Sequence, residues 1–555
     1  MFKNVQTSSS YIPVISREVM PEAQVPYTAD GTNQIRWLLP TYLGFISPTE
    51  SKIQYELTMQ GRGMPIPSPR AGCHSLIRDV RIQSGDAQAT LEEILDYNVL
   101  TATWWGYSEN QSIADKRTMF EGRDANPSVE TSLYYNGSAD WHAEEITVAT
   151  RMEPATIKIQ QPLYSGVMNS DKVFPVSATQ GLRLHLNLER NERALVYKQG
   201  ARGASTPNTA EGLASDNNIT LKVTLPAGAG AKADVGTTYN VDITNETVSF
   251  TASGPNNNNP FSIGDLLAVK KADGTVPQNL GIVSSMTTDG AGGLRLVMIH
   301  NQPAPFPTAG LLSEALAGSI VYYTNSERMN GWSPANVPAE LMPLAQEKVG
   351  YTMTNVVYLV GAVSPPELYV KAMMDQMSSS KGLALDISTY SLYRNTLTAT
   401  VGLTNSLIPA TQTRAYSCLS VPLSNEAQID MLADSLAGVV DNANSYQYVH
   451  KNRLIPDRPV TLRKTSQNFC DQLALLELEK ALVNCNVATR NLQRIPERFV
   501  IGRAFSKYGQ VADLENGTLT LRVEYSNLAT IQKILNHYIC HLSRITISQG
   551  NVTVS

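Results

Sequence analysis

The chain has 555 residues, which is too long for one hydrophobic core and indicates more than one domain. Its hydrophobic content of 42% and charged content of 17% exclude an intrinsically disordered chain. The net charge of −5 argues against a general nucleic-acid binder, and residues 1–30 contain no basic arm for a genome.

Residues 1–30 are polar, with scattered prolines and no periodicity. We predict an N-terminal arm that becomes ordered only against neighbouring molecules. From Gln34 onward apolar and polar residues alternate, which predicts strands up to Met59 and again over Leu76–Ile82. Leu91, Ile94, Leu95 and Val99 recur at helical spacing and predict one short helix over a sheet.

The clearest strand is expected over Gly181–Glu189, where four leucines alternate with Arg183, His185 and Asn187. This pattern predicts a half-buried strand with a polar outer face. Residues 201–345 differ in composition, being rich in Gly, Ala, Asn, Asp and Thr and low in aromatic residues. We interpret them as a β-rich surface insertion that leaves and re-enters the first domain.

Tyr351–Val363 is rich in Val and Tyr and predicts a buried strand. Ser364 as the N-cap, Pro365 and Glu367 then form a helix-start pattern, with Val363 and Leu368 placed for a hydrophobic staple. A short helix is only marginally stable by itself, so we expect it to pack on both sides, at a seam between two β-domains.

After Gly382 the pattern of the first half starts again. Two helices are expected, one beginning near Asn425 and Gln428 with Ile429, Leu432, Leu436 and Val439 facing a sheet, the other over residues 471–483. Strands are predicted over residues 385–392, 414–421, 446–449, 459–462, 499–505, 519–525, 538–547 and 551–554. Order and periodicity together favour two β-sandwiches of about eight strands each.

Four stretches of the chain resemble a known family. They are Gly85–Tyr97, Gln161–Gly166 continuing through Phe174-Pro-Val to Leu188, Asn355–Val360 followed by Pro365–Val370, and Tyr446–Pro459. In this order they are similar to the double jelly-roll major capsid proteins of tailless icosahedral double-stranded DNA viruses, above all those of polinton-like viruses and virophages.

The resemblance implies an all-β fold with two eight-stranded jelly rolls in tandem, short helices and a β-rich insertion in the first roll. The expected division is an arm (1–30), a first jelly roll (31–200 with 346–364), the insertion (201–345), a linker helix (365–381) and a second jelly roll (382–555).

The resemblance also implies a homotrimer with a six-sided outline that tiles a viral shell beside neighbouring capsomers, penton proteins and minor capsid proteins. The expected location is the virion. We expect a structural protein without cofactor, without sequence-specific nucleic-acid binding and without a membrane-spanning segment, because no apolar run is long enough to cross a bilayer.

Several clusters could in principle carry chemistry. Asp140, His142 and Glu144 would share one face of a strand and could hold a divalent metal, although a solvated strand or loop is the simpler interpretation. His537 and His541 are four residues apart, but the glutamate of a zinc-protease motif is missing and the region favours a strand.

Other pairs are interpreted as structural. Glu92 and Glu93 are expected to point in different directions from a helix, and Glu477 and Glu479 to lie on a solvated face. Five cysteines without a C-x-x-C pair favour reduced, buried thiols over a zinc site or a disulfide framework. The cysteines are Cys73, Cys418, Cys470, Cys485 and Cys540.

Two motifs leave alternatives open. Trp104, Trp105 and Tyr107 could form a sugar platform, while core or subunit contact is the simpler interpretation. Met373, Met374 and Met377 could bind a peptide, or pack at the seam. A β-sandwich adhesin that binds carbohydrate and a jelly-roll polysaccharide hydrolase are therefore kept as alternatives to the capsid subunit. The hydrolase would need two converging carboxylates, and the sequence shows no clear pair.

Overall fold

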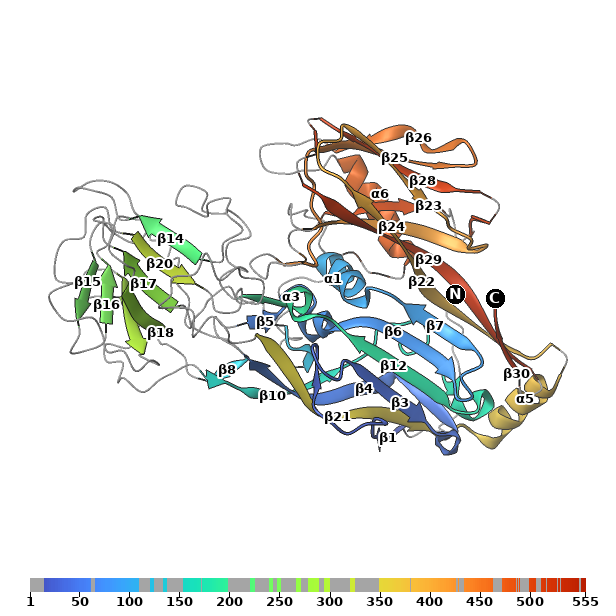
Figure 1. Cartoon of the computed structure of the whole chain (residues 1–555). Coiled ribbons are helices and arrows are strands. Elements are labelled where there is room, and N and C mark those ends of the chain that lie inside the picture. The colour runs from blue at the N-terminus through green and yellow to red at the C-terminus, as the bar shows by residue number, and fades with distance from the viewer. Residues whose placement is uncertain are drawn as a thin grey trace.

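The computed structural model shows two β-sandwiches side by side, with a separate seven-stranded β-sheet set apart from both (Figure 1). Described residues are 14–60, 65–108, 120–123, 133–136, 153–170, 172–197 and 349–555, the last range with gaps at 380, 426–427, 429–433, 463–471, 486, 488, 490–498, 506–510, 516, 527, 530 and 549–550. Between residues 198 and 348 the described residues are those of seven strands.

The first sandwich is formed by two antiparallel sheets. One has the order β1-β21-β4-β10, with β2 also paired to β21 and β11 to β4; the other has the order β3-β12-β6-β7. The strands are β1 (Val14–Val19), β2 (Tyr27–Thr28), β3 (Gln34–Leu39), β4 (Phe45–Gln60), β6 (Ile77–Ser84), β7 (Thr90–Ile94), β10 (Thr156–Gln161), β11 (Phe174–Pro175), β12 (Leu182–Leu188) and β21 (Gly350–Val363).

The second sandwich repeats this arrangement. Its sheets have the orders β22-β29-β24-β27, with β30 also paired to β29, and β23-β28-β25-β26. The strands are β22 (Leu383–Leu397), β23 (Leu403–Ile408), β24 (Ala415–Ser424), β25 (Ala443–His450), β26 (Arg453–Thr461), β27 (Ile501–Ala504), β28 (Leu519–Tyr525), β29 (Lys533–Ser548) and β30 (Asn551–Val554).

The strand order identifies both sandwiches as jelly rolls. In each, the first, eighth, third and sixth strands form one sheet, and the second, seventh, fourth and fifth form the other, if β1 and β2 together count as the first strand and the two-residue strand β11 is left out of the count. This is the order that arises when a long antiparallel hairpin folds over on itself. The predicted all-β fold with two jelly rolls in tandem is therefore confirmed.

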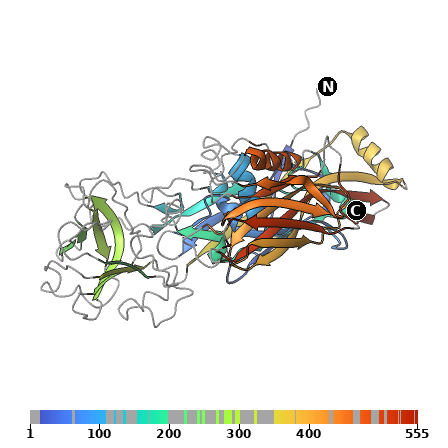
Figure 2. The ribbon, with the colours of Figure 1, turned by 90° about the horizontal axis from the view of Figure 1, so that it is seen from above.

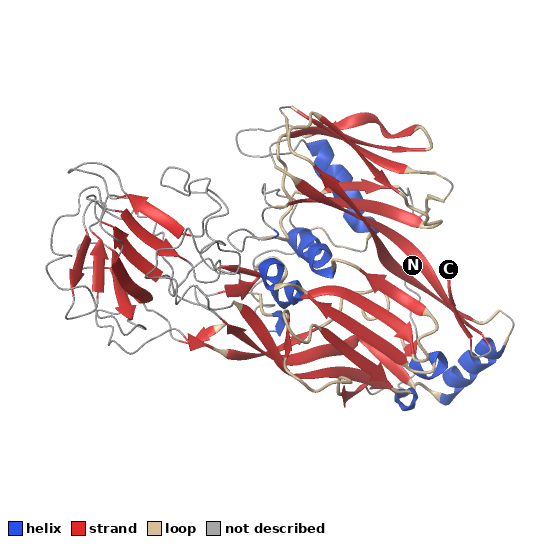
Figure 3. Cartoon of the chain, viewed as in Figure 1, coloured by secondary structure: helices blue, strands red, loops and turns tan. Residues whose placement is uncertain are grey.

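A helix lies between the fifth and sixth strands of each roll. These helices are α1 (Tyr97–Ser108) after β7 and α6 (Gln472–Asn484) after β26. Figure 3 shows both in blue beside the sheets. The prediction of a helix over residues 471–483 is confirmed. The helix predicted near Asn425 cannot be compared in full, because residues 429–433 lie outside the described part of the chain.

Strands in which buried apolar residues alternate with polar, partly exposed ones were predicted correctly. In β12 the side chains of Leu182, Leu184, Leu186 and Leu188 are buried while the residues between them are partly exposed. The expected helix across Leu91 and Ile94 is wrong, because residues 90–94 form β7 and the helix begins at Tyr97. Leu91 and Ile94 are buried in a strand, together with Glu92, so spacing alone misassigned a strand with an irregular burial pattern.

The segment expected to be an arm contributes to the first roll. β1 pairs with β21 from Val14↔Val363 to Val19↔Tyr358, and β2 pairs with the same strand further along. The expectation that residues 1–30 are ordered only against neighbours is thus wrong for the two strands. Backbone hydrogen bonds to β21 hold them in place within one chain.

The linker helix α5 (Glu367–Ser378) exists, but its environment differs from the prediction. Its N-cap residue is Pro366 without a side-chain capping bond, so Ser364 does not form the expected capping box. Leu368 is 82% exposed and therefore makes no hydrophobic staple, and Met373 is the one methionine of the helix that is fully buried. Figure 1 shows α5 at one end of the molecule, so it connects the rolls without lying between them.

The insertion carries an antiparallel sheet of its own. Seven strands form it in the order β14-β20-β17-β18-β19-β16-β15. They are β14 (Thr220–Thr224), β15 (Tyr239–Asp242), β16 (Thr247–Phe250), β17 (Leu266–Lys270), β18 (Gln278–Thr288), β19 (Leu294–Ile299) and β20 (Ile320–Thr324). In chain order the sheet lies between the seventh and eighth strands of the first roll, and Figure 2 shows it at the end of the molecule opposite α5.

Candidate functional site at the junction of the two jelly rolls

Several buried and hydrogen-bonded charged residues lie where the two rolls meet. Asp96, in the turn between β7 and α1, has a side chain that is 3% exposed. Its carboxylate accepts a hydrogen bond from Asn536 Nδ2 at 2.7 Å and forms an ion pair with Arg394. Its backbone oxygen accepts a bond from the Tyr538 hydroxyl at 2.9 Å. A single acidic residue of the first roll is thus held by two strands of the second, β22 and β29.

Arg193 provides the second charge at Asp96. It lies in the short helix α3 (Asn191–Ala194), and its guanidinium is 3.5 Å from Asp96 Oδ1 and 3.0 Å from Glu189 Oε2. Burial alone would raise the pKa of Asp96, but Arg193 and Arg394 hold it below its ordinary value. The carboxylate therefore stays ionised inside the junction.

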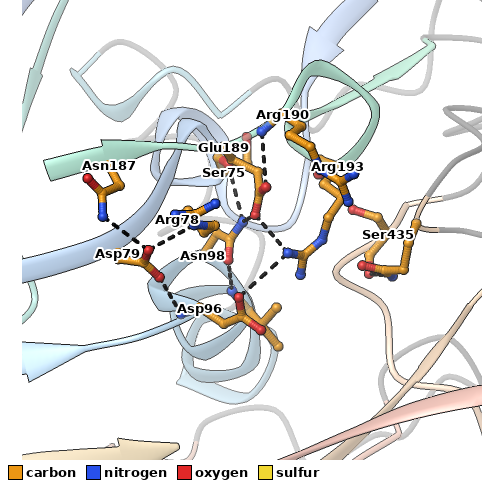
Figure 4. A network of polar contacts seen from close by, with 12 residues as sticks. Ser75, Arg78, Asp79, Asp96, Asn98, Asn187, Glu189, Arg190, Arg193 and Ser435 are labelled. Atoms are coloured by element: carbon orange, nitrogen blue, oxygen red, sulfur yellow. Dashed lines mark hydrogen bonds and ion pairs between the residues drawn. The ribbon is translucent and has the colours of Figure 1, made fainter. Parts of the chain in front are cut away.

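Glu189 and its neighbours extend this network into the first roll (Figure 4). Burial raises the pKa of Glu189 despite the Arg193 charge, and the Asn98 side chain and the Arg190 backbone N–H donate to its carboxylate at 2.9 Å and 3.0 Å. The Arg193 carbonyl accepts a bond of 2.6 Å from Ser435 of the second roll. The network is therefore anchored on both sides of the junction.

A second buried acid shapes the adjacent loop. Glu92 on β7 accepts hydrogen bonds from the backbone N–H groups of Gly166 at 2.8 Å and Val167 at 3.0 Å. Burial raises the pKa of Glu92 above its ordinary value. The loop is pressed against β22 so closely that a Cβ at Gly166 would lie 2.3 Å from the Ser388 carbonyl oxygen. Glycine is needed here because of this close backbone approach.

Aromatic side chains also pack across the junction. The Trp104 ring lies 5.2 Å from Tyr390 of β22 and 6.3 Å from Tyr164, between ring centroids. Trp105 is 3% exposed. One hydrophobic cluster, against which Trp104 and Tyr164 pack, runs from the first roll through Tyr390 into the second and reaches Tyr538 and Cys540. The tryptophan pair thus belongs to the core, which confirms core contact over the sugar platform.

Asp434 of the second roll makes a further contact with the first roll, at Ser68 and Arg70. Asp434, between β24 and β25, accepts a hydrogen bond of 2.8 Å from the Ser68 hydroxyl. The Arg70 guanidinium lies 3.1 Å from the same carboxylate. Contacts at the Asp96 network, at Gly166 and at Asp434 together restrict rotation of one roll against the other more than any one of them alone.

Of the histidines and acidic pairs singled out in the sequence, those that the structure describes make hydrogen bonds and ion pairs within the fold. His537 and His541 both lie on β29 and bond to Ser420 at 2.7 Å and Ser391 at 2.9 Å. Burial lowers the pKa of His537 to about 3 and that of His541 to about 4, so both are neutral at pH 7. Within the described ranges no three His, Cys, Asp or Glu side chains gather as metal ligands.

Two expectations about acidic residues are corrected. Glu92 and Glu93 lie on a strand, not on a helix, and only Glu92 points into the junction. Glu477 was expected on a solvated face but is buried, where it pairs with Arg503 and, at 3.0 Å, with Lys480. Asp140, His142 and Glu144 lie outside the described residues.

The described cysteines fit the prediction of buried thiols. Cys73, Cys418, Cys485 and Cys540 are buried and not bonded to one another as disulfides. Burial raises the pKa of Cys73 and of Cys418 to about 12, so both are thiols and not reactive thiolates at neutral pH. Cys470 lies outside the described residues.

The junction was missed by sequence reasoning. Asp96 and Asn536 are 440 positions apart, and neither belongs to a recognisable motif. The sequence did contain a local sign of a turn. Asp96, Tyr97 and Asn98 interrupt two apolar segments, the strand before them and the remainder of α1 after them. This sign could indicate a turn, but not which distant residues would surround it.

Comparisons with known proteins give structural likeness but no sequence match. No protein-family model matches the chain, and no curated protein matches it. The structure is similar to the Faustovirus major capsid protein, with 8% identity over 99% of this chain and 92% of that chain and a TM-score of 0.48. It is similar to PBCV-1 VP54, fitted into a reconstruction of the virophage Sputnik, with 8% identity over 100% and 99% of the chains and a TM-score of 0.47.

A third likeness is to the mavirus major capsid protein, with 8% identity over 100% of this chain and 92% of that chain and a TM-score of 0.37. Because all three TM-scores lie below 0.5, the jelly-roll assignment rests on the strand order and not on these likenesses. Among the residues that the structure describes, no helix is long and apolar enough to cross a membrane.

Proposed function

We propose that this protein is a major capsid protein, a structural subunit of an icosahedral viral shell. The observation that carries the proposal is the pair of jelly rolls with identical strand order in one chain, held side by side by a buried junction. Two similar walls per chain allow three copies to approximate six-fold symmetry, and such a trimer is a closed cyclic assembly.

The molecule has two distinct ends, which suits a shell with an inside and an outside. The insertion sheet lies at one end and α5 at the other (Figure 1). We propose that the insertion forms the outward surface and that the α5 end faces the interior, beside minor capsid and penton proteins. The proposed location is the virion. The division into an arm, two rolls, insertion 201–345 and linker 365–381 stays a prediction, with β1 and β2 assigned to the first roll.

The two alternatives have less support from the described residues. An adhesin would use exposed aromatic residues as a sugar platform, but Trp105 is buried and Trp104 packs on Tyr390. A polysaccharide hydrolase would need two carboxylates facing a cleft, whereas Asp96 and Glu92 are buried in hydrogen-bonded structural positions.

The test is the assembly state of the purified full-length chain. We expect light scattering to give the mass of three copies at micromolar concentration, and electron microscopy to show six-sided particles. Obligate interfaces of this kind bury on the order of 2,000 Å² or more, so the trimer should persist on dilution. A stable monomer over the whole concentration range would refute the capsomer.

A further inference from the structure

Within one chain, the junction joins two particular strands. The first strand of the second roll, β22, lies against the fifth strand of the first roll, β7. Ser388 of β22 meets Gly166, which is held by Glu92 of β7, and Arg394 of β22 pairs with Asp96 directly after β7. A first-strand edge and a fifth-strand edge are therefore complementary in this fold.

The described strands include one more edge of each kind, and no other described strand pairs with the outer side of either. β1, the first strand of the first roll, is an edge strand on which every residue from Val14 to Glu18 is exposed. Ile15 is 52% exposed, and Met20 and Val25 in the segment leading to β2 are 52% and 43% exposed. Large apolar side chains gathered along an open strand edge mark a contact surface, because such edges are otherwise protected by charge or covered.

β26, the fifth strand of the second roll, is the matching edge. It ends the order β23-β28-β25-β26, and Leu454 on it is 43% exposed. The charges on the two edges are complementary in kind. β1 exposes Arg17 and Glu18, and β26 exposes Arg453, Asp457 and Arg458.

We propose that β1 and the segment up to β2 of one copy bind β26 of the next copy, which repeats between chains the contact that β22 and β7 make within one chain. The proposal rests on the capsid function proposed above, whose trimer it deepens by naming the strands. The two surfaces are unlike, so the contact is head-to-tail, and such contacts close into a ring when the rotation per copy divides a full turn. Each chain then contains one such contact between its own two rolls and makes a second one with the next copy. If the two contacts turn neighbouring rolls by the same angle, three chains close the ring.

The contact between copies differs from the internal one in chemistry. The internal junction contains buried ions, Asp96, Arg193 and Glu189, whereas the exposed edges offer apolar side chains flanked by opposite charges. This composition, an apolar centre with a charged rim, is that of an interface formed after folding. The internal junction, by contrast, forms as part of the fold.

The test uses charge substitutions with a matched control. Ile15→Glu places a carboxylate on β1, and Leu407→Glu does the same at a side chain of equal exposure, 52%, on β23, the opposite edge of the sheet that contains β26. We expect Ile15→Glu to raise the trimer dissociation constant at least about tenfold in sedimentation equilibrium, a loss of about 1.4 kcal/mol, and Leu407→Glu to leave it unchanged. Far-UV circular dichroism checks that both variants are folded.

Charge reversal gives an independent test. Arg458→Glu is expected to weaken the trimer, and the double change Glu18→Arg with Arg458→Glu to restore it at least in part. In addition, Glu18→Cys combined with Arg458→Cys should yield a three-chain cross-linked product with a short bismaleimide, while the unsubstituted chain, whose described cysteines are buried, should not.

The outcomes separate this inference from the proposed function. If the unsubstituted protein is a monomer, the capsomer itself fails. If it is a trimer that Ile15→Glu and Arg458→Glu leave intact and that gives no cross-linked product, the strand assignment fails while the capsomer stands. A trimer broken equally by Leu407→Glu also overturns the assignment.

Discussion

The two jelly rolls share a strand order but differ in the connections between strands. Between the seventh and eighth strands the first roll has residues 189–349, including the sheet of β14–β20, whereas the second roll has only residues 526–532. The first strand also differs, since β22 is continuous over Leu383–Leu397 while its counterpart is interrupted between β1 and β2. The paired strands are thus the constant part, and the loops carry what distinguishes one roll from the other.

The rolls also differ in how their cores are connected. The larger hydrophobic cluster begins in the first roll and continues through the junction into the second, whereas a smaller cluster belongs to the second roll alone. We infer that the junction is part of the folding unit of the first roll and not a contact between two independent bodies. The following substitutions test that difference.

The largest effect is expected at the buried charge of the junction. Asp96→Ala leaves the buried Asn536 amide without its acceptor and removes one of the two carboxylates that face the buried Arg193 guanidinium, losses that together should cost about 3–5 kcal/mol. We expect a loss of that order in the free energy of unfolding, measured with urea. Glu93→Ala, one strand residue away from Glu92 and exposed, is the control and should change it by less than about 0.5 kcal/mol. Equal effects of the two would contradict the role assigned to the junction.

Equivalent leucines compare the two cores directly. Leu184 on β12 and Leu521 on β28 lie on the seventh strands of the two rolls, and both are fully buried. Each change to alanine should cost about 2–5 kcal/mol. Because Leu184 belongs to the cluster that spans the junction, Leu184→Ala should lower the thermal transition of both rolls together, while Leu521→Ala should lower that of the second roll first. Calorimetry distinguishes these outcomes, and identical traces would show that the cores are not distinct.

A smaller effect is expected from adding one methyl group at the junction. Gly166→Ala would bring a Cβ to 2.3 Å from the Ser388 carbonyl, so backbone must move, at a cost of about 1–3 kcal/mol. Gly402→Ala is the matched control in the second roll, where the nearest atom would be 3.7 Å away. Unfolding curves of the two variants should separate clearly. Their coincidence would mean that the loop and β22 can move apart without loss.

The smallest effect concerns pH. The folded pKa of Glu92 is raised by burial, so this group favours the folded state most below its unfolded pKa of about 4.3, and the contribution is lost as pH rises through the folded pKa. Asp96 acts in the opposite sense, since its folded pKa is lowered and its contribution is lost only as pH falls through that value. Glu92→Gln should therefore make the unfolding free energy less dependent on pH above about 4.3. An unchanged slope would show that Glu92 does not titrate as described.

The sequence predicted those elements in which burial follows a simple period. β12 and β21 were recognised because their apolar residues alternate or form a buried run, and α6 because its leucines follow helical spacing. β23 was missed for a physical reason. Its buried residues include Thr404 and Ser406, while Leu403 and Leu407 point outward, so its hydrophobic pattern is the inverse of a usual half-buried strand.

The junction could not be predicted in the same way. Its side chains come from β22, β29, α3 and the turn before α1, and each of them reads locally as an ordinary polar residue. Only the packing of one roll on the other reveals that Asp96 is buried. The environment of α5 was predicted wrongly because its apolar side chains were expected to be covered by both rolls. In the structure Leu368, Tyr369 and Met374 are exposed.

The two ends of the long connection in the first roll lie close together in space. Asn191, just after β12, is so near to Gly350, the first residue of β21, that a Cβ on this glycine would lie 3.2 Å from the asparagine side chain. Because these two ends are so close, the segment inserted between β12 and β21 can differ in length without moving either strand. Related proteins could therefore carry different inserted domains at this position while the jelly roll keeps its shape. A foreign domain could be inserted by design at the same position.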